Sequence, residues 1–323
     1  MSTQARRAER RAAPKPAVLS GEASAGRSAS ELTPSGDRAG YSPTEGLQVP
    51  KAEFDFKPLL LLGAVLLAAW PLIGSSSTWL TLSVAGLAMG LIIFVIASGL
   101  TLIFGLMDVL NFGHGVFIAL GAFVATSVMG GMADWTASES LMSNLAAVFA
   151  AMLIAMAAAG ALGLAFERVI VRPVYGLHLK QILITMGGMI VGEELIKVIW
   201  GPLQIPLPLP AALRGSFVIG DASIEKYRVL AVAIGLVVFA LLLFALNRTK
   251  VGLLIRAGVQ DREMVESLGY RIRRLFVVVF AAGSALAGLG GVMWGLYQQS
   301  VTPQIGAQVN VLIFIVIIIG GLG

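Results

Sequence analysis

Long runs of apolar residues, separated by short polar segments, make up most of this chain. One crossing of a bilayer takes about 20 apolar residues in a helix, and most of the runs reach or approach that length. The pattern therefore predicts an all-α fold, a polytopic transmembrane helix bundle over residues 58–323. The apolar runs lie at 58–74, 80–107, 116–129, 141–166, 181–200, 228–246, 276–297 and 309–319.

The two ends of the chain depart from this pattern. Residues 1–57 are rich in Ala, Ser, Gly, Pro, Arg and Glu and have no apolar periodicity. Such a segment cannot bury enough surface to offset the entropy lost on ordering, so we expect a disordered tail. The last run, Val309 to Ile319, is too short to cross a bilayer, so we expect an incomplete C-terminal span.

The polar segment at residues 247–275 determines the expected orientation of every span. Short loops that are rich in Lys and Arg stay in the cytoplasm, and this loop has more basic than acidic residues. We therefore expect both the loop and the N-terminal tail to be cytoplasmic. Its basic residues are Arg248, Lys250, Arg256, Arg262, Arg271, Arg273 and Arg274, and its acidic residues are Asp261, Glu263 and Glu266.

The same segment contains a candidate short amphipathic helix. Val259, Val265 and Leu268 share one face of it, although not in perfect phase, and Gly269 follows as a helix stop. Such a helix is suited to docking on another protein. The alternative is a solvated loop that only obeys the positive-inside rule, and composition alone slightly favours that alternative. In either case we expect the charged residues here to be solvated: Arg256, Asp261, Arg262 and Glu266.

Composition narrows the class of protein. Of the 323 residues, 57% are hydrophobic and 13% charged, against about 25% charged in soluble domains, so this is an integral membrane protein. The net charge of +5 does not indicate nucleic-acid binding, because the basic residues lie in the tail and in loops where topology requires them. The chain has no cysteine, and His114 and His178 are far apart. We therefore expect no metal site, no cofactor and no enzymatic constellation.

A Gly-rich polar turn interrupts the apolar pattern at residues 106–115. The preceding run, 80–107, is roughly 42 Å long as a helix, so we expect it to tilt, to break or to project from the membrane, with Gly99 and Gly105 as plausible break points. Irregular backbone at membrane depth is tolerated only where protein covers it or water reaches it. The turn therefore either lines a polar path or is a tight cytoplasmic turn, and the sequence does not separate these. Its polar and glycine residues are Asn111, Gly113, His114 and Gly115.

A second charged group lies inside an apolar run. Glu193, Glu194 and Lys197 fall about two-thirds of the way along the run 181–200, and Glu193 and Lys197 have the favourable i,i+4 order. They form either a polar patch beside a substrate path or an ion pair that reaches the outer headgroups. The sequence favours the ion pair.

Several stretches resemble the signatures of one protein family. GLTLIFGLMDVLNFGHGVFIALGAFVA, at 99–125, resembles the permease family of branched-chain amino-acid ABC importers, and the LivH-like branch fits best. ERVIVRPV, at 167–174, is similar to the E-R-x-x-x-R-P loop of that family. RAGVQDREMVESLGY, at 256–270, is similar to its version of the EAA loop, which docks on the ATPase subunit. The closing IIIGGLG also matches, so the resemblance covers residues 80–323.

The resemblance implies a permease subunit of an ABC importer in a bacterial inner membrane, without chemistry of its own. Its substrates would be branched-chain amino acids or related small polar solutes. Its partners would be two ABC ATPase subunits, a second permease subunit and a periplasmic solute-binding protein, besides the lipid bilayer. The sequence departs from the family at Val265, where a small Ala is usual, and the family continues beyond the final GGLG.

The resemblance also assigns roles to residues. It favours coupling to the ATPase over a bland loop for Arg256, Asp261, Arg262, Glu263, Glu266 and Gly269. It favours a place on the substrate pathway for Asn111, Gly113, His114 and Gly115, and we add Glu193 and Glu194 as candidates. The alternative function is a stand-alone channel or ion-coupled secondary transporter, for which Glu193 and Glu194 are the candidate coupling carboxylates.

Overall fold

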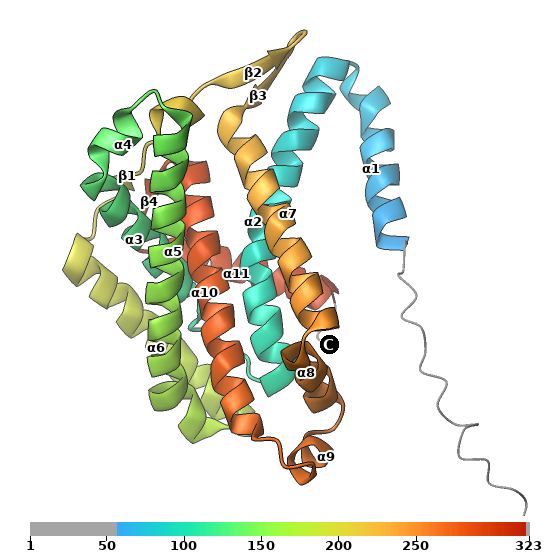
Figure 1. Cartoon of the computed structure of the whole chain (residues 1–323), viewed down its shortest axis with the longest axis vertical. Helices are drawn as coiled ribbons and strands as arrows, with labels where there is room; N and C mark the ends of the chain where they lie inside the picture. The colour runs from blue at the N-terminus through green and yellow to red at the C-terminus, as the bar shows by residue number, and fades with distance from the viewer. Residues whose placement is uncertain (1–56, 321–323) are drawn as a thin grey trace, which may run out of the picture. The chain divides into compact units, whose positions relative to one another are not determined.

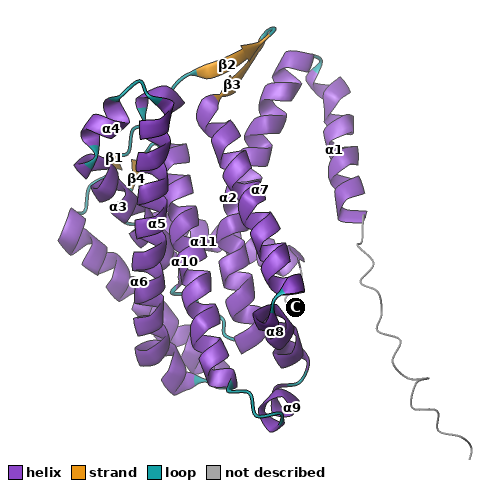
Figure 2. Cartoon of the chain, viewed as in Figure 1, coloured by secondary structure: helices purple, strands orange, loops and turns teal. Residues whose placement is uncertain are grey.

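The structure, a computed structural model, describes residues 57–320, and most of the backbone in this part of the chain is helical (Figure 1, Figure 2). The prediction of an all-α helix bundle is therefore confirmed. The tail predicted over 1–57 lies outside the described residues, apart from Lys57, at which the first helix begins.

The helices α1 to α11 follow one another along the chain with two short pairs of strands between them. The strand pairs are β1 (Ile205–Pro206) with β4 (Ser300–Val301) and β2 (Ser216–Ile219) with β3 (Ala222–Glu225), both antiparallel. The helices are α1 (Lys57–Ile73), α2 (Ser76–Met107), α3 (His114–Gly131), α4 (Ala133–Ala137), α5 (Leu141–Phe166), α6 (His178–Trp200), α7 (Lys226–Arg248), α8 (Lys250–Gln260), α9 (Arg262–Ser267), α10 (Ile272–Gln298) and α11 (Ile305–Gly320), with a π-helical turn η2 (Glu167–Val171) and the 3-10 turns η3 (Arg172–Val174) and η4 (Ala211–Leu213).

Within residues 57–320, five helices are long and apolar enough to cross a membrane. They are α2, α3, α5 with its continuation to Val174, α7 and α10. The helices α1 and α11 are apolar but shorter, and α6 has three charged residues in its C-terminal half. The chain therefore has the architecture of a multi-pass membrane protein.

The central helix of the bundle is α10, which packs against α2, α3 and α5 (Figure 1). Small residues allow transmembrane helices to approach closely, and here pairs of glycines bring backbones together. In each pair, a Cβ atom added to either glycine would overlap the backbone of the other helix or a side chain packed there. The pairs are Gly99 on α2 with Gly283 on α10, and Gly115 on α3 with Gly306 on α11. A Cβ atom on Gly121 of α3 would likewise overlap the Gly288 backbone of α10, whereas one on Gly288 would meet Ala155 and Ala159 of α5.

Of the three alternatives for the run 80–107, the break at Gly99 or Gly105 does not occur. The helix α2 is continuous over 32 residues, from Ser76 to Met107, which is roughly 48 Å of helix. That length exceeds the roughly 30 Å hydrocarbon core, so the helix tilts or projects from the membrane. Gly99 serves the contact with α10 and causes no break, and a side chain on Gly105 would meet open space.

The loops at the β2–β3 end of the bundle are fastened by one buried amide. The Asn144 Nδ2 atom lies 3.0, 2.7 and 3.0 Å from the carbonyl oxygens of Trp135, Ser138 and Ser140. Its Oδ1 accepts a hydrogen bond of 2.9 Å from the Ala212 N–H. The side chain is fully buried and joins α5 to the loop that follows α6.

Replacing Asn144 with alanine is expected to destabilise the protein. The carbonyl groups of Trp135, Ser138 and Ser140 and the Ala212 N–H would each lose a hydrogen bond to the side chain, and a typical hydrogen bond contributes about 0.5–1.5 kcal/mol. The melting temperature of the purified protein measures this loss. Asn247→Ala is the matched control, because Asn247 is exposed. Equal melting temperatures for the two variants would contradict the assignment.

Candidate functional site

The polar turn predicted at residues 106–115 re-enters the bundle. Asp108 takes the left-handed conformation, φ +53°, at the end of α2, a conformation that Asp tolerates better than most residues. The chain then turns back along α2 until the His114 Nε2 atom lies 3.3 Å from the Ile96 carbonyl oxygen. Ile96 is about three helical turns, roughly 16 Å, from the Met107 end of α2.

The start of α3 is therefore at mid-depth in the bundle. Val109, Asn111 and His114 are fully buried. This geometry does not fit a tight turn at the membrane surface with His114 at the interface. It fits irregular backbone covered by protein within the membrane.

Two other helices, α6 and α11, contribute polar groups around this turn. The Phe112 N–H donates to Thr185 Oγ1 of α6 at 3.2 Å, and the Asn310 Nδ2 of α11 donates to the Phe112 carbonyl at 2.9 Å. The side chains that form this cluster are buried within the described part of the chain, and we refer to them as the polar cluster: Asn111, His114, Gln181, Thr185 and Asn310.

The polar cluster retains unused hydrogen-bonding capacity. Within residues 57–320, both amide atoms of Asn111 have no partner, nor do His114 Nδ1, Gln181 Oε1 and Asn310 Oδ1. A buried polar atom without a partner costs about 1–3 kcal/mol, so such atoms are rarely concentrated in one place without a functional reason. Together they offer donors and acceptors that could exchange hydrogen bonds with a polar solute.

Aromatic rings border the polar cluster. Phe112 stacks on Phe314 of α11 with ring centroids 4.6 Å apart. The Phe117 ring meets the edges of Phe166 and Phe280 at 5.5 and 6.0 Å. Phe166 lies where a side chain on Gly113 would be. Gly113 is therefore needed so that this ring can pack against the turn.

Sequence reasoning missed Gln181, Thr185 and Asn310. Each is an isolated polar residue in an apolar helix, which is itself a signal, since polar groups in transmembrane segments tend to face the bundle interior. Their grouping was not predictable, because they come from α6 and α11, far from the turn in sequence.

Glu193 and Glu194 lie apart from the polar cluster. Lys197 Nζ is 3.0 Å from Glu193 Oε1 and 2.8 Å from Glu194 Oε1, so the favoured ion pair is present. The Glu194 side chain is 63% exposed, which does not fit a buried coupling carboxylate. On α6, Glu193 follows Thr185 by about two helical turns, roughly 12 Å. The structure therefore does not bring the two predicted groups of pathway residues together.

The candidate coupling loop consists of two helices, and the predicted face shared by Val259, Val265 and Leu268 is wrong. Asp261 separates α8 from α9: its backbone is extended, and its side chain accepts a hydrogen bond from the Met264 N–H at 2.9 Å as an N-cap. As a result Val265 is buried, whereas Val259 and Leu268 are exposed. Gly269 ends α9 with φ +86°, so the predicted helix stop is confirmed.

Arg262 is exposed, as expected, and its side chain also reaches α2. Its Nη2 donates to the Leu106 carbonyl at 3.0 Å, and its guanidinium lies 5.3 Å from the centre of the Phe276 ring on α10. Leu106 is next to the last residue of α2 and immediately precedes the re-entrant turn. Arg262 therefore joins α9 to the helix end from which the polar turn starts.

The other predicted coupling residues stay on the surface. Glu263 and Glu266 are exposed, and Arg256 donates to Asn247 Oδ1 at 3.3 Å within the same loop. These side chains remain available to a partner, whereas Asp261 is engaged in capping α9.

The E-R-x-x-x-R-P stretch forms a second connection at the same end of the bundle. The Tyr175 hydroxyl donates to Oε1 of Glu167, which is buried in the π-helical turn. The Tyr175 ring meets Phe276 edge-on at 5.7 Å. Burial, and then the hydrogen bond to Glu167, raises the pKa of Tyr175 well above its ordinary value. The stabilisation from the neutral phenol is therefore fully present below about pH 10 and is lost only as the pH rises further.

Tyr175→Phe is expected to lower the free energy of unfolding by about 1–3 kcal/mol, because a buried carboxyl group loses its partner. Thermal unfolding of the purified protein at neutral pH measures this change. Tyr270→Phe, at a residue that is 54% exposed, is the matched control and should melt like the parent. A Tyr175→Phe variant that also melts like the parent would show that this bond does not stabilise the fold.

Comparisons with known proteins agree with the sequence resemblance. Residues 82–323 match the family described as branched-chain amino acid transport system / permease component. The chain is 29% identical over 249 residues, 74% of this chain and 78% of the relative, to the high-affinity branched-chain amino acid transport system permease protein BraD of Pseudomonas aeruginosa.

Two Escherichia coli proteins are also similar. They are the high-affinity branched-chain amino acid transport system permease proteins LivH and LivM. The identity to LivH is 27% over 245 residues, 74% of this chain and 77% of LivH. The identity to LivM is 27% over 293 residues, 83% of this chain and 64% of LivM. No solved structure matches the chain.

Proposed function

The chain belongs to the permease component family of branched-chain amino acid transport systems, and from this premise we propose that it is a transmembrane permease subunit of an ABC importer. Its substrates are branched-chain amino acids or related small polar solutes, as the names of the relatives suggest. It has no catalytic role of its own. Separate ATPase subunits supply the energy.

The proposed assembly has five polypeptides: this permease, a second permease subunit, two ABC ATPase subunits and a periplasmic solute-binding protein. Similarity to both LivH and LivM supports pairing with a second permease. The assembly resides in a bacterial inner membrane. The basic loop that contains α8 and α9 faces the cytoplasm, as does the N-terminus, because Lys and Arg accumulate on that side.

The contact between Arg262 and the Leu106 carbonyl carries the proposal. It gives a direct mechanical route from the surface of α9 to the polar turn in the bundle. The ATPase meets the loop through Arg256, Glu263, Glu266 and the α9 boundaries set by Asp261 and Gly269. Its closure moves α9, and Arg262 transmits the movement to the end of α2. The turn that follows is displaced with it.

The polar cluster is the proposed part of the substrate path. Asn111 and His114 present unpaired polar atoms there, and Gly113 and Gly115 allow Phe166 and α11 to pack against the turn. The solute exchanges hydrogen bonds with these groups as access alternates between the two sides. Glu193 and Glu194 border the path near its outer mouth, apart from the cluster.

Uptake into vesicles tests the proposal against an ion-coupled transporter. The permease, reconstituted with its ATPases, second permease and binding protein, should accumulate radiolabelled leucine or an analogue when ATP is enclosed on the ATPase side. A proton gradient without ATP should not drive uptake, and Glu194→Gln should retain ATP-driven uptake. Gradient-driven uptake that Glu194→Gln abolishes would overturn the proposal in favour of the alternative.

A further inference from the structure

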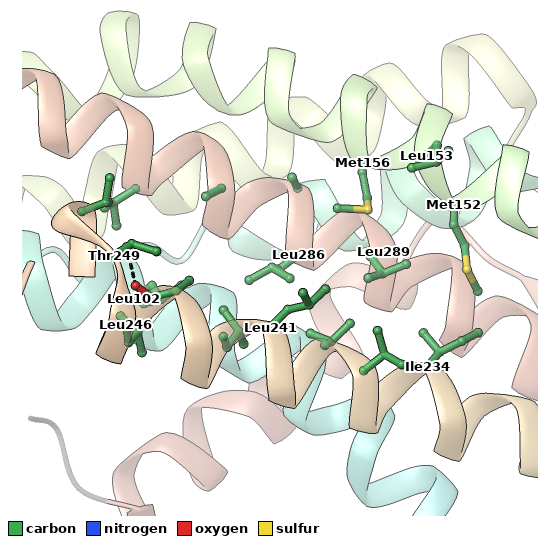
Figure 3. A pocket seen from close by; sticks show the side chains of 18 of the residues that line it. Leu102, Met152, Leu153, Met156, Ile234, Leu241, Leu246, Thr249, Leu286 and Leu289 are labelled. Carbon is green, nitrogen blue, oxygen red and sulfur yellow. Dashed lines mark hydrogen bonds between the residues drawn. The ribbon is translucent and has the colours of Figure 1, made fainter. Parts of the chain in front are cut away.

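A long apolar groove runs between α5 and α7, over the surface of α10. Its volume is about 710 Å³, and Figure 3 shows its wall, with Met156 from α5, Leu241 from α7 and Leu286 from α10. Among the described residues that line the groove, Thr249 has a polar side chain, and its hydroxyl donates a hydrogen bond to the Ala245 carbonyl. The groove therefore has no polar group free to select a polar ligand.

The dimensions of the groove suit an extended hydrocarbon chain. Its lining on α7 runs from Leu230 to Leu246, roughly 24 Å along the helix axis. The acyl chains of one leaflet span about half of the roughly 30 Å hydrocarbon core of a bilayer, so the groove is long enough for one such chain.

At the α8–α9 end, the groove continues into a basic cleft. Val278 of α10 lines both the groove and this cleft, which has a volume of about 580 Å³. Among the residues 57–320 that line the cleft, the one carboxyl group is that of Glu167, which is buried and bonded to Tyr175. The cleft also contains four exposed arginines, none of which forms an ion pair with another described residue: Arg168, Arg172, Arg273 and Arg274.

We propose that groove and cleft together bind one anionic phospholipid, with an acyl chain along α10 and the phosphate against the four arginines. Guanidinium groups bind phosphate through paired hydrogen bonds, and basic pockets beside transmembrane helices bind anionic headgroups. An apolar helix from a protein partner would fill the groove but leave the arginines without a counter-charge. The site depends on membrane residence and is independent of the proposed transport function.

A lipid titration of the purified full chain, measured by native mass spectrometry, tests whether the arginines select an anionic headgroup. Phosphatidylglycerol should bind more tightly than phosphatidylcholine with the same acyl chains. Two double variants remove the arginines in pairs: Arg168→Gln/Arg172→Gln and Arg273→Gln/Arg274→Gln. Each arginine removed should lower the affinity for phosphatidylglycerol by about fivefold. Lys180→Gln, an exposed basic residue outside the cleft, should bind like the parent. Equal affinity for the two lipids, or an equal loss in Lys180→Gln, would overturn the proposal.

A second variant tests the apolar part of the site. Ala282→Trp, at an exposed residue that lines the groove, should weaken binding of both lipids. Val198→Trp, on the exposed face of α6, should weaken neither. Competition by inorganic phosphate as strong as that by phosphatidylglycerol, with Ala282→Trp unaffected, would mean an anion site without a lipid. Dissociation of a complex between two copies of the chain by Ala282→Trp would mean a subunit interface. Either result would overturn the proposal.

Discussion

Arg262→Gln is expected to uncouple ATP hydrolysis from transport. The variant loses a charged hydrogen bond to the Leu106 carbonyl, worth about 1.5–3 kcal/mol, and the contact with the Phe276 ring. A loss of this size corresponds to a fall in uptake per ATP hydrolysed of about tenfold or more. Uptake and phosphate release, measured together in reconstituted vesicles, give this ratio.

The control must remove the same charge without removing the contact to α2. Arg248→Gln does so, because Arg248 is exposed at the end of α7, and its ratio should match that of the parent. If Arg262→Gln keeps the parental ratio, α9 does not act through Leu106.

Charge reversal at Glu263 should also uncouple ATP hydrolysis from transport, because it disturbs the surface that meets the ATPase while leaving the Arg262 contact in place.

Asn111→Leu is expected to abolish most of the uptake without destabilising the protein. Leucine has the same number and branching of heavy atoms as asparagine and removes two buried amide atoms that have no partner within residues 57–320. Relief of such atoms stabilises by about 1–3 kcal/mol, so the melting temperature should hold or rise. Uptake should fall at least about tenfold, the equivalent of 1.4 kcal/mol, because the solute loses two hydrogen-bonding groups.

The contrast with Asn144 makes this prediction specific. Asn144 is also fully buried, but both its amide atoms have partners, so its replacement should lower stability. A structural amide and a substrate-binding amide are thus separated by the sign of the change in melting temperature. If Asn111→Leu melts below the parent and transports normally, the Asn111 amide has a structural role and the polar cluster is not on the path.

Much of the fold was predictable because apolar periodicity is a local signal. The run 141–166 became α5 without a change of boundary, and the interruption at 106–115 lies between α2 and α3. The errors arose where local signals compete. Gly99 signals a break when read locally, yet its neighbour across the bundle is Gly283, and tertiary contact decides its role.

Less of the candidate site was predictable, because its parts meet through packing. Asn111 and His114 were found because the irregular turn places them together in sequence. Thr185 and Asn310 were missed, since nothing in the sequence relates α6 or α11 to that turn. The prediction of one apolar helix face in the coupling loop was wrong for a different reason. Asp261 forms an N-cap that divides the segment into two helices, whereas the apolar periodicity indicates one.

The glycine contacts around α10 have a further consequence. Where two helices meet backbone to backbone, as at Gly99 and Gly283 or at Gly291 and Ile118, no side chain separates the helices at the point of contact. Such helices can shift along their axes without changing rotamers, whereas ridge-in-groove packing resists that shift. A displacement applied at one end of the bundle would then propagate as a small rigid-body translation and would require no local unfolding.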